Sequence, residues 1–154
     1  MSVMQKSSMV CLDASFVLRL ILGGPGAKKA EDLWTSWSKE GIQPAAPALI
    51  FYEVANAVYR LSFNGVVTFD EAEEALDITH DLRIASYTDA FIHKRAPALA
   101  RNAGLKAVYD AHYLALAENL GTELWTADRR LANAVRDEYP WVKCLDDVEV
   151  ETVE

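Results

Sequence analysis

Short apolar runs alternate with segments of helical periodicity along almost the whole chain, and this alternation is the feature that most limits the fold. An apolar run of about four residues bounded by turn signals is typical of a buried strand. Strands that alternate with helices indicate βαβ units, in which the strands are parallel and both faces of the sheet are covered. We therefore predict an α/β fold, a three-layer α/β/α sandwich around a central, mainly parallel sheet. The expected strands are Met9–Leu12, Ile42–Ala45, Ile84–Tyr87, Glu123–Thr126 and Val142–Leu145.

Helical segments fill the intervals between these runs. Glycines follow several of the segments, and a glycine in the left-handed conformation is a common end to a helix. Thr68 and Glu71 match a capping box, in which the hydroxyl and the carboxylate each accept a free amide of the first turn. We expect helices over 15–22, 27–39, 49–64, 68–82, from about 92 or 97 to 103, and over 110–120 and 129–138.

The length and the apolar pattern predict a single domain without a membrane segment. A chain of 154 residues is the size of one compact domain. Its longest stretch without a charged residue, 41–52, is shorter than the roughly 18 to 20 residues that span a bilayer. The apolar run before Asp13 is too short for a secretion signal. We therefore predict one domain over 1–154 in the cytoplasm, with 1–8 frayed and 146–154 as an acidic tail.

Charge and cysteine content exclude several function classes. The net charge of −8 argues against a protein that coats nucleic acid or anionic membranes through bulk charge. One stretch, 90–109, carries four basic residues and no acid, which fits either a solvated helix face or a local contact for a polyanion. Cys11 and Cys144 lack the spacing of a zinc site or a redox motif, so we expect them to be buried thiols.

The predicted fold brings four acidic residues to one edge of the sheet. Asp13 directly follows the first strand, and Asp128 lies just past the end of a later strand. The carboxyl ends of parallel strands line one edge of such a sheet, and ligands bind there. Glu53 and Asp110 each stand in a long stretch without other acids, on helices that begin at the same edge. We expect the four side chains to share one crevice.

Each acid has a simpler interpretation when it is taken alone. An aspartate at the start of a helix accepts hydrogen bonds from the first free amides, and Glu53 fits the polar stripe of an amphipathic helix. Together in a partly desolvated crevice, however, four carboxylates repel one another strongly, so we expect a bound cation. Oxygen ligands favour Mg²⁺ or Mn²⁺, and the three histidines lack the spacing of a zinc site. This pattern alone predicts a metal-dependent phosphoesterase.

Four segments carry motifs that are weak singly but strong in their order and spacing, including YDAHYLALA and TADRRL: Val10–Ser15, Glu53–Ala57, Val108–Ala117 and Leu124–Leu131. Together they resemble the PIN-domain family, in particular the VapC toxins of prokaryotic toxin–antitoxin pairs, over nearly the whole chain. The resemblance implies a PIN-like sandwich fold and an endoribonuclease that depends on Mg²⁺ or Mn²⁺. It also implies a homodimer and a small antitoxin protein that neutralises the enzyme.

The same resemblance assigns roles to individual residues. Ser15 and Thr126 match positions that orient an acid or a water, and the supporting residue Asn56 lies on the same helical stripe as Glu53. Arg129 and Arg130 are candidate contacts for RNA backbone phosphates. One or two metal ions, with Asp13 and Asp110 as direct ligands, would assist a water in its in-line attack on the phosphodiester. The acidic quartet implied as catalytic and metal-binding is Asp13, Glu53, Asp110 and Asp128.

Two other functions stay open at this point. A phosphatase of the haloacid-dehalogenase type also has an aspartate after its first strand, but it needs a second one two positions later, where this chain has Ser15. A catalytically silent PIN-like module that binds RNA or a protein is the other, and an intact quartet speaks against it. Aromatic residues at helical spacing fit either the core or a groove for a partner; they are Trp34, Trp37, Phe16 and Tyr59. Which RNA is cleaved, where, and whether DNA is also cleaved stay undetermined.

Overall fold

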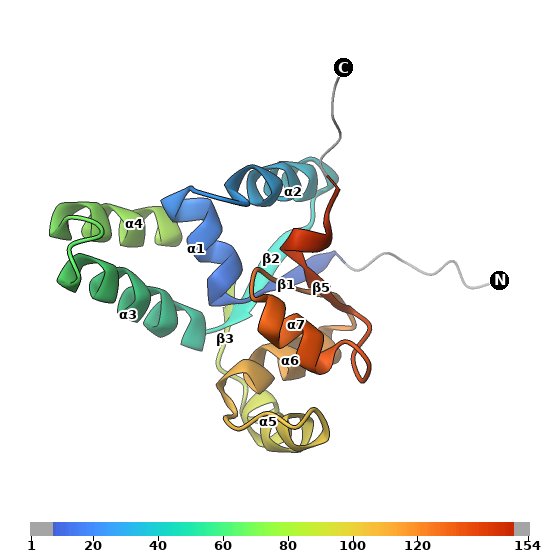
Figure 1. Ribbon diagram of the computed structural model, residues 1–154. Helices are drawn as coiled ribbons and strands as arrows, with labels where there is room; N and C mark the ends of the chain where they lie inside the picture. Colours follow the sequence, from blue (N-terminus) through green and yellow to red (C-terminus); the bar gives the residue numbers. More distant parts are fainter. Residues whose placement is uncertain (1–7, 150–154) are drawn as a thin grey trace.

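A computed structural model describes residues 8–149 of the chain. Within them, short strands alternate with helices as the sequence predicts, and Figure 1 shows their arrangement. The elements are β1 Met9–Leu12, α1 Ala14–Leu22, α2 Ala27–Glu40, β2 Gln43–Pro47, α3 Leu49–Phe63, α4 Phe69–Asp81, β3 Ala85–Tyr87, α5 Ala90–Asn102, α6 Tyr109–Leu120, β4 Leu124–Thr126, α7 Arg129–Val135, β5 Val142–Cys144 and a short 3₁₀ turn, Leu145–Asp147.

The described strands form one sheet in the order β3-β2-β1-β4-β5, and every pairing in it is parallel. Helices α1 and α2 lie on one side of the sheet in Figure 1, and α5, α6 and α7 lie on the other. The chain runs from β1 to β3 in one direction across the sheet and then from β3 to β5 in the other. Because crossovers between parallel strands are right-handed, the helices of the first part lie on one face and those of the second part on the other. The predicted three-layer α/β/α sandwich is therefore confirmed, and its sheet is parallel throughout the described residues.

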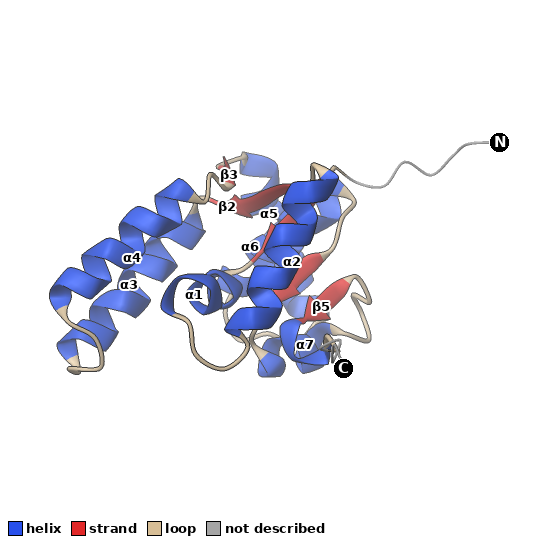
Figure 2. Ribbon diagram, turned by 90° about the horizontal axis from the view of Figure 1, so that it is seen from above, coloured by secondary structure: helices blue, strands red, loops and turns tan. Residues whose placement is uncertain are grey.

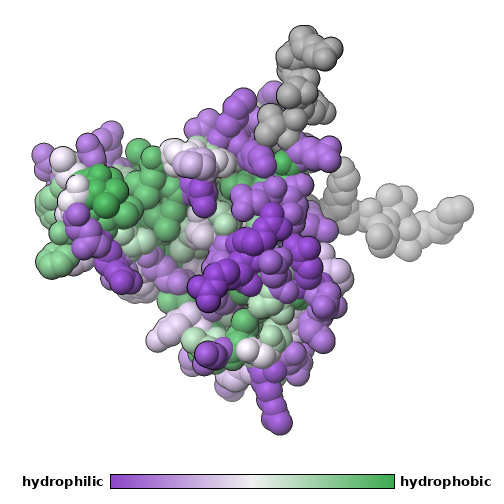
Figure 3. Space-filling view, in the orientation of Figure 1, coloured by the Kyte–Doolittle hydropathy of each residue, from purple (hydrophilic) through white to green (hydrophobic). Residues whose placement is uncertain are grey.

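Helices α3 and α4 form a hairpin that projects away from the sheet and runs side by side in both views (Figures 1 and 2). The hairpin has a small core of its own around Val58 and Ala75, which packs against α1. The predicted capping box opens α4: the Thr68 hydroxyl accepts from the Glu71 amide, and the Glu71 carboxylate accepts from the Thr68 amide. Exposed apolar side chains gather over this hairpin in Figure 3, among them Phe63 at 78% and Val66 at 68% exposure.

Several predicted boundaries are wrong by a few residues. Strand β2 begins after Ile42, whose amide donates to Trp37 at the end of α2, and it continues to Pro47. Helix α5 begins at Ala90 because the Asp89 side chain caps its first turn, and it continues through Pro97. Helix α7 ends at Val135, three residues before the predicted end.

The predictions for the two ends of the chain fall partly outside the described residues. The carbonyl oxygen of Ser8 accepts a hydrogen bond from the amide of Gln43 at the start of β2. Asp147, placed by the sequence in an acidic tail, lies in the 3₁₀ turn and forms ion pairs with Arg129 and Arg136. Positions 1–7 and 150–154 lie outside the described residues.

The core lies between the sheet and its two helical layers. Phe16 and Trp37 are both buried, with ring centroids 5.5 Å apart, so for these two the core interpretation is confirmed; Tyr59 is exposed. Cys11 and Cys144 are buried free thiols, as predicted, and burial raises the pKa of Cys11 to about 12. Among residues 8–149, no helix combines the length and the apolar character that crossing a bilayer requires.

Candidate active site

The carboxyl ends of β1 and β4 lie next to each other and position the first two acids of the site. Leu12 pairs with Trp125 in the parallel ladder, so the residues that follow both strands emerge at the same edge. Asp13 follows β1 and Asp128 lies two residues past β4. Each is also the N-cap of the next helix, so the capping interpretation holds alongside the site that they form together.

Asp13 is the most buried of the four acids, with 4% of its surface exposed. Its Oδ1 accepts from the Ser15 hydroxyl at 2.6 Å and from the Phe16 amide at 3.0 Å, and its Oδ2 accepts from the Thr126 hydroxyl at 2.5 Å. Burial raises the pKa of Asp13 to about 6; the three hydrogen bonds lower it, and the nearby charge of Asp110 raises it. The carboxylate is therefore held in one orientation in an environment that disfavours its charge.

Ser15 and Thr126 connect Asp13 to the loop that carries Asp128. The two hydroxyl oxygens are 3.1 Å apart, and the Ser15 oxygen accepts from the Ala127 amide at 2.9 Å. The Thr126 oxygen accepts from the Asp128 amide at 3.0 Å. This network links the ends of β1 and β4 through side chains as well as through the sheet.

Glu53 reaches the site from α3 and is oriented by a tyrosine that the sequence analysis missed. The Tyr113 hydroxyl, on α6, donates to Glu53 Oε1 at 2.6 Å. Burial raises the pKa of Glu53, the Tyr113 hydrogen bond lowers it, Asp110 raises it and His112 lowers it. Burial also raises the pKa of Tyr113, and the neighbouring acids add to that effect. Tyr113 lies three positions after Asp110, one helical turn away, and this spacing is the signal that would have identified it.

Asp110, in the first turn of α6, interacts electrostatically with each of the other three acids. Its charge raises the pKa of both Asp13 and Glu53. Its own pKa is raised by burial and by the charge of Asp128. The structure thus brings the four predicted acids into one electrostatic neighbourhood, with Asp128 at its exposed rim.

The remaining predicted residues lie at different distances from this neighbourhood. Asn56 is exposed on α3, nearly one turn beyond Glu53. Arg130 is exposed at the start of α7. Arg129 is bound to Asp147, with 2.7 Å between Nη1 and Oδ1. Of the two arginines, Arg130 is therefore the one without an ion pair in the described part of the chain.

The chemistry of this donor set suits a hard divalent cation. It offers carboxylate and hydroxyl oxygens, and within residues 8–149 no lysine or arginine forms an ion pair with any of the four acids. No three histidine, cysteine, aspartate or glutamate side chains in that same range are grouped closely enough to enclose a metal ion. Mg²⁺ keeps several of its waters and is commonly bound through only one or two carboxylates. A set of acids spread in this way therefore suits Mg²⁺ better than it suits a cation that the protein must surround completely.

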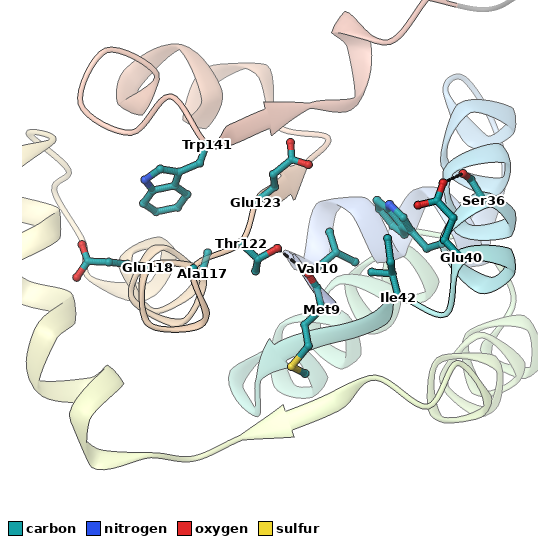
Figure 4. A pocket seen from close by; sticks show the side chains of 12 residues that line it. Met9, Val10, Ser36, Glu40, Ile42, Ala117, Glu118, Thr122, Glu123 and Trp141 are labelled. Atoms are coloured by element: carbon teal, nitrogen blue, oxygen red, sulfur yellow. Dashed lines mark hydrogen bonds between the residues drawn. The ribbon is translucent and has the colours of Figure 1, made fainter. Parts of the chain in front are cut away.

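A cavity of about 630 Å³ lies at the opposite edge of the sheet, away from these acids (Figure 4). It is lined by residues at the start of the strands, such as Met9, Ile42 and Trp141. Because ligands of parallel sheets bind at the carboxyl ends of the strands, cavity size alone is a poor guide to the active site here.

Comparisons with known proteins agree with the fold. The model of the PIN domain family matches residues 10–137. Ribonuclease VapC3 of Pyrobaculum aerophilum is 42% identical over 88 residues, which cover 54% of this chain and 65% of that protein. The match therefore spans slightly less than two thirds of the length of this curated relative.

Two solved structures are similar to the whole sandwich. A crystal structure of a protein from Pyrobaculum aerophilum has a TM-score of 0.63 and 24% identity, covering 85% of this chain and 83% of that one. A toxin–antitoxin complex from Klebsiella pneumoniae has a TM-score of 0.65 and 18% identity, covering 92% and 99%. At these identities the likeness shows a shared fold.

Proposed function

Because the family model spans most of its length, the chain belongs to the PIN domain family, and we propose that it is a divalent-metal-dependent endoribonuclease, the toxin of a VapBC-type toxin–antitoxin pair. We propose that it hydrolyses RNA phosphodiester bonds and that it acts in the cytoplasm. The ribonuclease name of the curated relative and the toxin–antitoxin complex among the similar folds both support this proposal.

One observation carries the proposal: the carboxylate of Asp13 is buried beside other acids, and none of the described lysines or arginines neutralises it. A buried charge without a partner destabilises a fold. A module that only binds RNA gains nothing from four neighbouring acids, since they repel phosphates. A site that binds a divalent cation gains its ligands from the same arrangement.

In this proposal, the four acids have different roles. We propose that Asp13, Glu53 and Asp110 would hold one or two cations, with Asp13 and Asp110 as the direct ligands, and that Asp128 would complete a second position or contact a water. When bound, Mg²⁺ or Mn²⁺ lowers the pKa of a water and stabilises negative charge on the phosphodiester oxygens.

Neighbouring side chains keep these acids in place for catalysis. Ser15 and Thr126 donate to the two oxygens of Asp13 and so fix the plane of its carboxylate. Tyr113 holds one oxygen of Glu53 and leaves the other for a ligand. Arg130 is exposed beside Asp128 and is placed to bind a backbone phosphate, while Arg129 must first leave Asp147.

We also propose a small antitoxin and a second copy of this chain as protein partners. The exposed apolar side chains of the α3–α4 hairpin, such as Phe63 and Val66, offer a surface for a protein. Co-expression with a neighbouring small open reading frame would test the first partner, and light scattering of the purified protein would test the second.

The decisive experiment incubates purified, partner-free protein with a pool of structured RNAs and with single-stranded DNA in Mg²⁺, Mn²⁺ or EDTA, and maps the new ends. We expect cleavage of RNA with either metal and none with EDTA. Asp13→Asn should lose at least a hundredfold in rate while its circular dichroism spectrum is unchanged. RNA binding without cleavage in any metal would instead identify a silent module, and full activity of Asp13→Asn would remove the metal site from the mechanism.

A further inference from the structure

A second, smaller cavity lies at the same edge of the sheet as the acids. Its volume is about 210 Å³, and it opens where β2 and β3 end, between Pro47 and Tyr87. The first turn of α3 lines it at Leu49, one helical turn before Glu53, and α6 lines it at His112. The cavity therefore borders the candidate active site. It is smaller than the roughly 300 Å³ at which sites for drug-sized ligands begin, and it suits a single flat ring system.

Two histidines determine the hydrogen-bonding character of one wall. His112 Nδ1 is 2.8 Å from the carbonyl oxygen of Val108, which only accepts, so Nδ1 carries the proton and Nε2 of the neutral ring is an acceptor. His93 Nδ1 is 3.2 Å from that Nε2 and therefore donates to it. The neutral His93 ring is left with Nε2 as an acceptor, and that atom has no hydrogen-bond partner among the described residues.

Asp89, one helical turn before His93, offers a second acceptor. Asp89 uses Oδ1 to cap α5, accepting from the Phe91 amide at 2.8 Å. Its Oδ2 accepts no hydrogen bond from the described part of the chain. The side chains that line this cavity include neither lysine nor arginine; besides Asp89 and the two histidines, its polar side chains are those of Tyr87 and Thr88.

We propose that this cavity binds one unpaired base of the RNA next to the cleaved bond, and that it selects a base with an exocyclic amino group. The inference rests on the proposed ribonuclease function and adds to it the basis of substrate selection. Unstacked RNA bases bind against aromatic rings, which Tyr87 and His93 supply here. Acceptors on Asp89 and His93 match the amino groups of cytosine, adenine and guanine, whereas uracil presents a carbonyl oxygen at the equivalent position.

Exposed aromatic residues around the site favour a single-stranded substrate. Tyr52 follows Phe51 on α3 and precedes Glu53, and it is 75% exposed; Tyr109 precedes Asp110 and is 62% exposed. Bases of a single strand stack on such side chains whatever their identity. These residues would hold neighbouring bases, while the cavity would read one.

The test separates recognition from catalysis. We would measure the binding of four fluorescein-labelled RNA heptamers in EDTA, all uridine except for a central U, C, A or G. The heptamers with an amino-bearing central base should bind about tenfold more tightly than the all-uridine one. Asp89→Asn keeps the cap, because the amide oxygen accepts from Phe91, but it replaces the second acceptor with a donor. It should abolish this discrimination, and His93→Phe, which keeps an aromatic ring, should weaken it.

Cleavage of the same heptamers in Mn²⁺ adds the second measurement, with Asp77→Asn, an exposed acid on α4, as the charge-matched control. We expect Asp89→Asn to alter KM for the four substrates and Asp77→Asn to leave all four unchanged. Equal base preference in the wild type and Asp89→Asn, or no preference in the wild type, would overturn the inference even if the RNA is cleaved. Base-dependent binding that Asp89→Asn abolishes would support the cavity even if no metal produces cleavage, in which case only the proposed function fails.

Discussion

The burial of Asp13 leads to a quantitative prediction about stability. Its folded pKa of about 6 lies above the value of 3.8 for an unperturbed aspartate. Between these two pH values the folded state holds more of the Asp13 proton than the unfolded state does. The free energy of unfolding therefore falls as pH rises through this window, and the loss is complete above the folded pKa. A shift of about two pKa units corresponds to about 3 kcal/mol, since one unit is 1.36 kcal/mol.

Asp13→Asn removes this titration but keeps an oxygen that accepts from the Phe16 amide. We therefore expect the unfolding free energy of the variant, relative to the wild type, to rise by about 2.4 kcal/mol between pH 4 and pH 7. Urea denaturation in EDTA at each pH measures the difference, and equal m-values ensure that the two transitions are comparable. Asp77→Asn, which removes an exposed acid, should show no such rise.

Divalent cations should offset most of this difference. A cation that binds only the folded state stabilises the wild type by about 2.7 kcal/mol at a hundred times its dissociation constant. Asp13→Asn should gain far less at the same Mn²⁺ concentration. The reasoning is refuted if the difference between variant and wild type is constant from pH 4 to pH 7, or if Mn²⁺ stabilises both proteins equally.

Three further substitutions test two residues that contact the acids and one helix cap far from them. Thr126→Val removes a donor to the buried Asp13 and should lower the unfolding free energy by about 1–3 kcal/mol, whereas Thr126→Ser should have little effect; equal urea midpoints for both would contradict this. Tyr113→Phe removes a donor that lowers the pKa of Glu53, so calorimetry should find Mn²⁺ binding weakened about tenfold, and unchanged affinity would argue against Glu53 as a ligand. Thr68→Ala breaks the capping box far from the site and should lower the unfolding free energy by about 1 kcal/mol without altering cleavage; a loss of specific activity in the folded variant would contradict that separation.

The positions of the acids could be predicted from the sequence because they depend on local rules. A residue that follows a parallel strand emerges at the carboxyl edge of the sheet, so Asp13 and Asp128 were placed without knowing the strand order. Their adjacency depends on which strands are neighbours, and β1 pairs with β4 across more than a hundred residues. The shared edge is predictable from the sequence, but the strand order that makes β1 and β4 neighbours has no local signal.

Other features could not be predicted because they depend on how helices pack. Nothing in the sequence distinguishes Asp89 from an ordinary loop residue, because its role depends on α5 beginning directly after it. From the sequence, the predicted start of that helix is at about Ile92 or Pro97, whereas α5 begins at Ala90. The cavity forms only where α5 and α6 bring His93 and His112 together, and no local pattern indicates that contact.

The buried, acidic surroundings that make the Asp13 carboxylate costly for the fold also make it suitable for binding a cation. Ser15 and Thr126 donate to Asp13 and lower its pKa, but burial outweighs them, so ionising the carboxylate weakens the folded state. Replacing these donors with apolar groups would free no ligand and would leave the carboxylate poorly oriented. A neutral side chain at position 13 would relieve the electrostatic penalty, as expected for Asp13→Asn, but would remove a negative ligand. If the proposed function is right, greater stability without metal and loss of catalysis must therefore appear in the same variant.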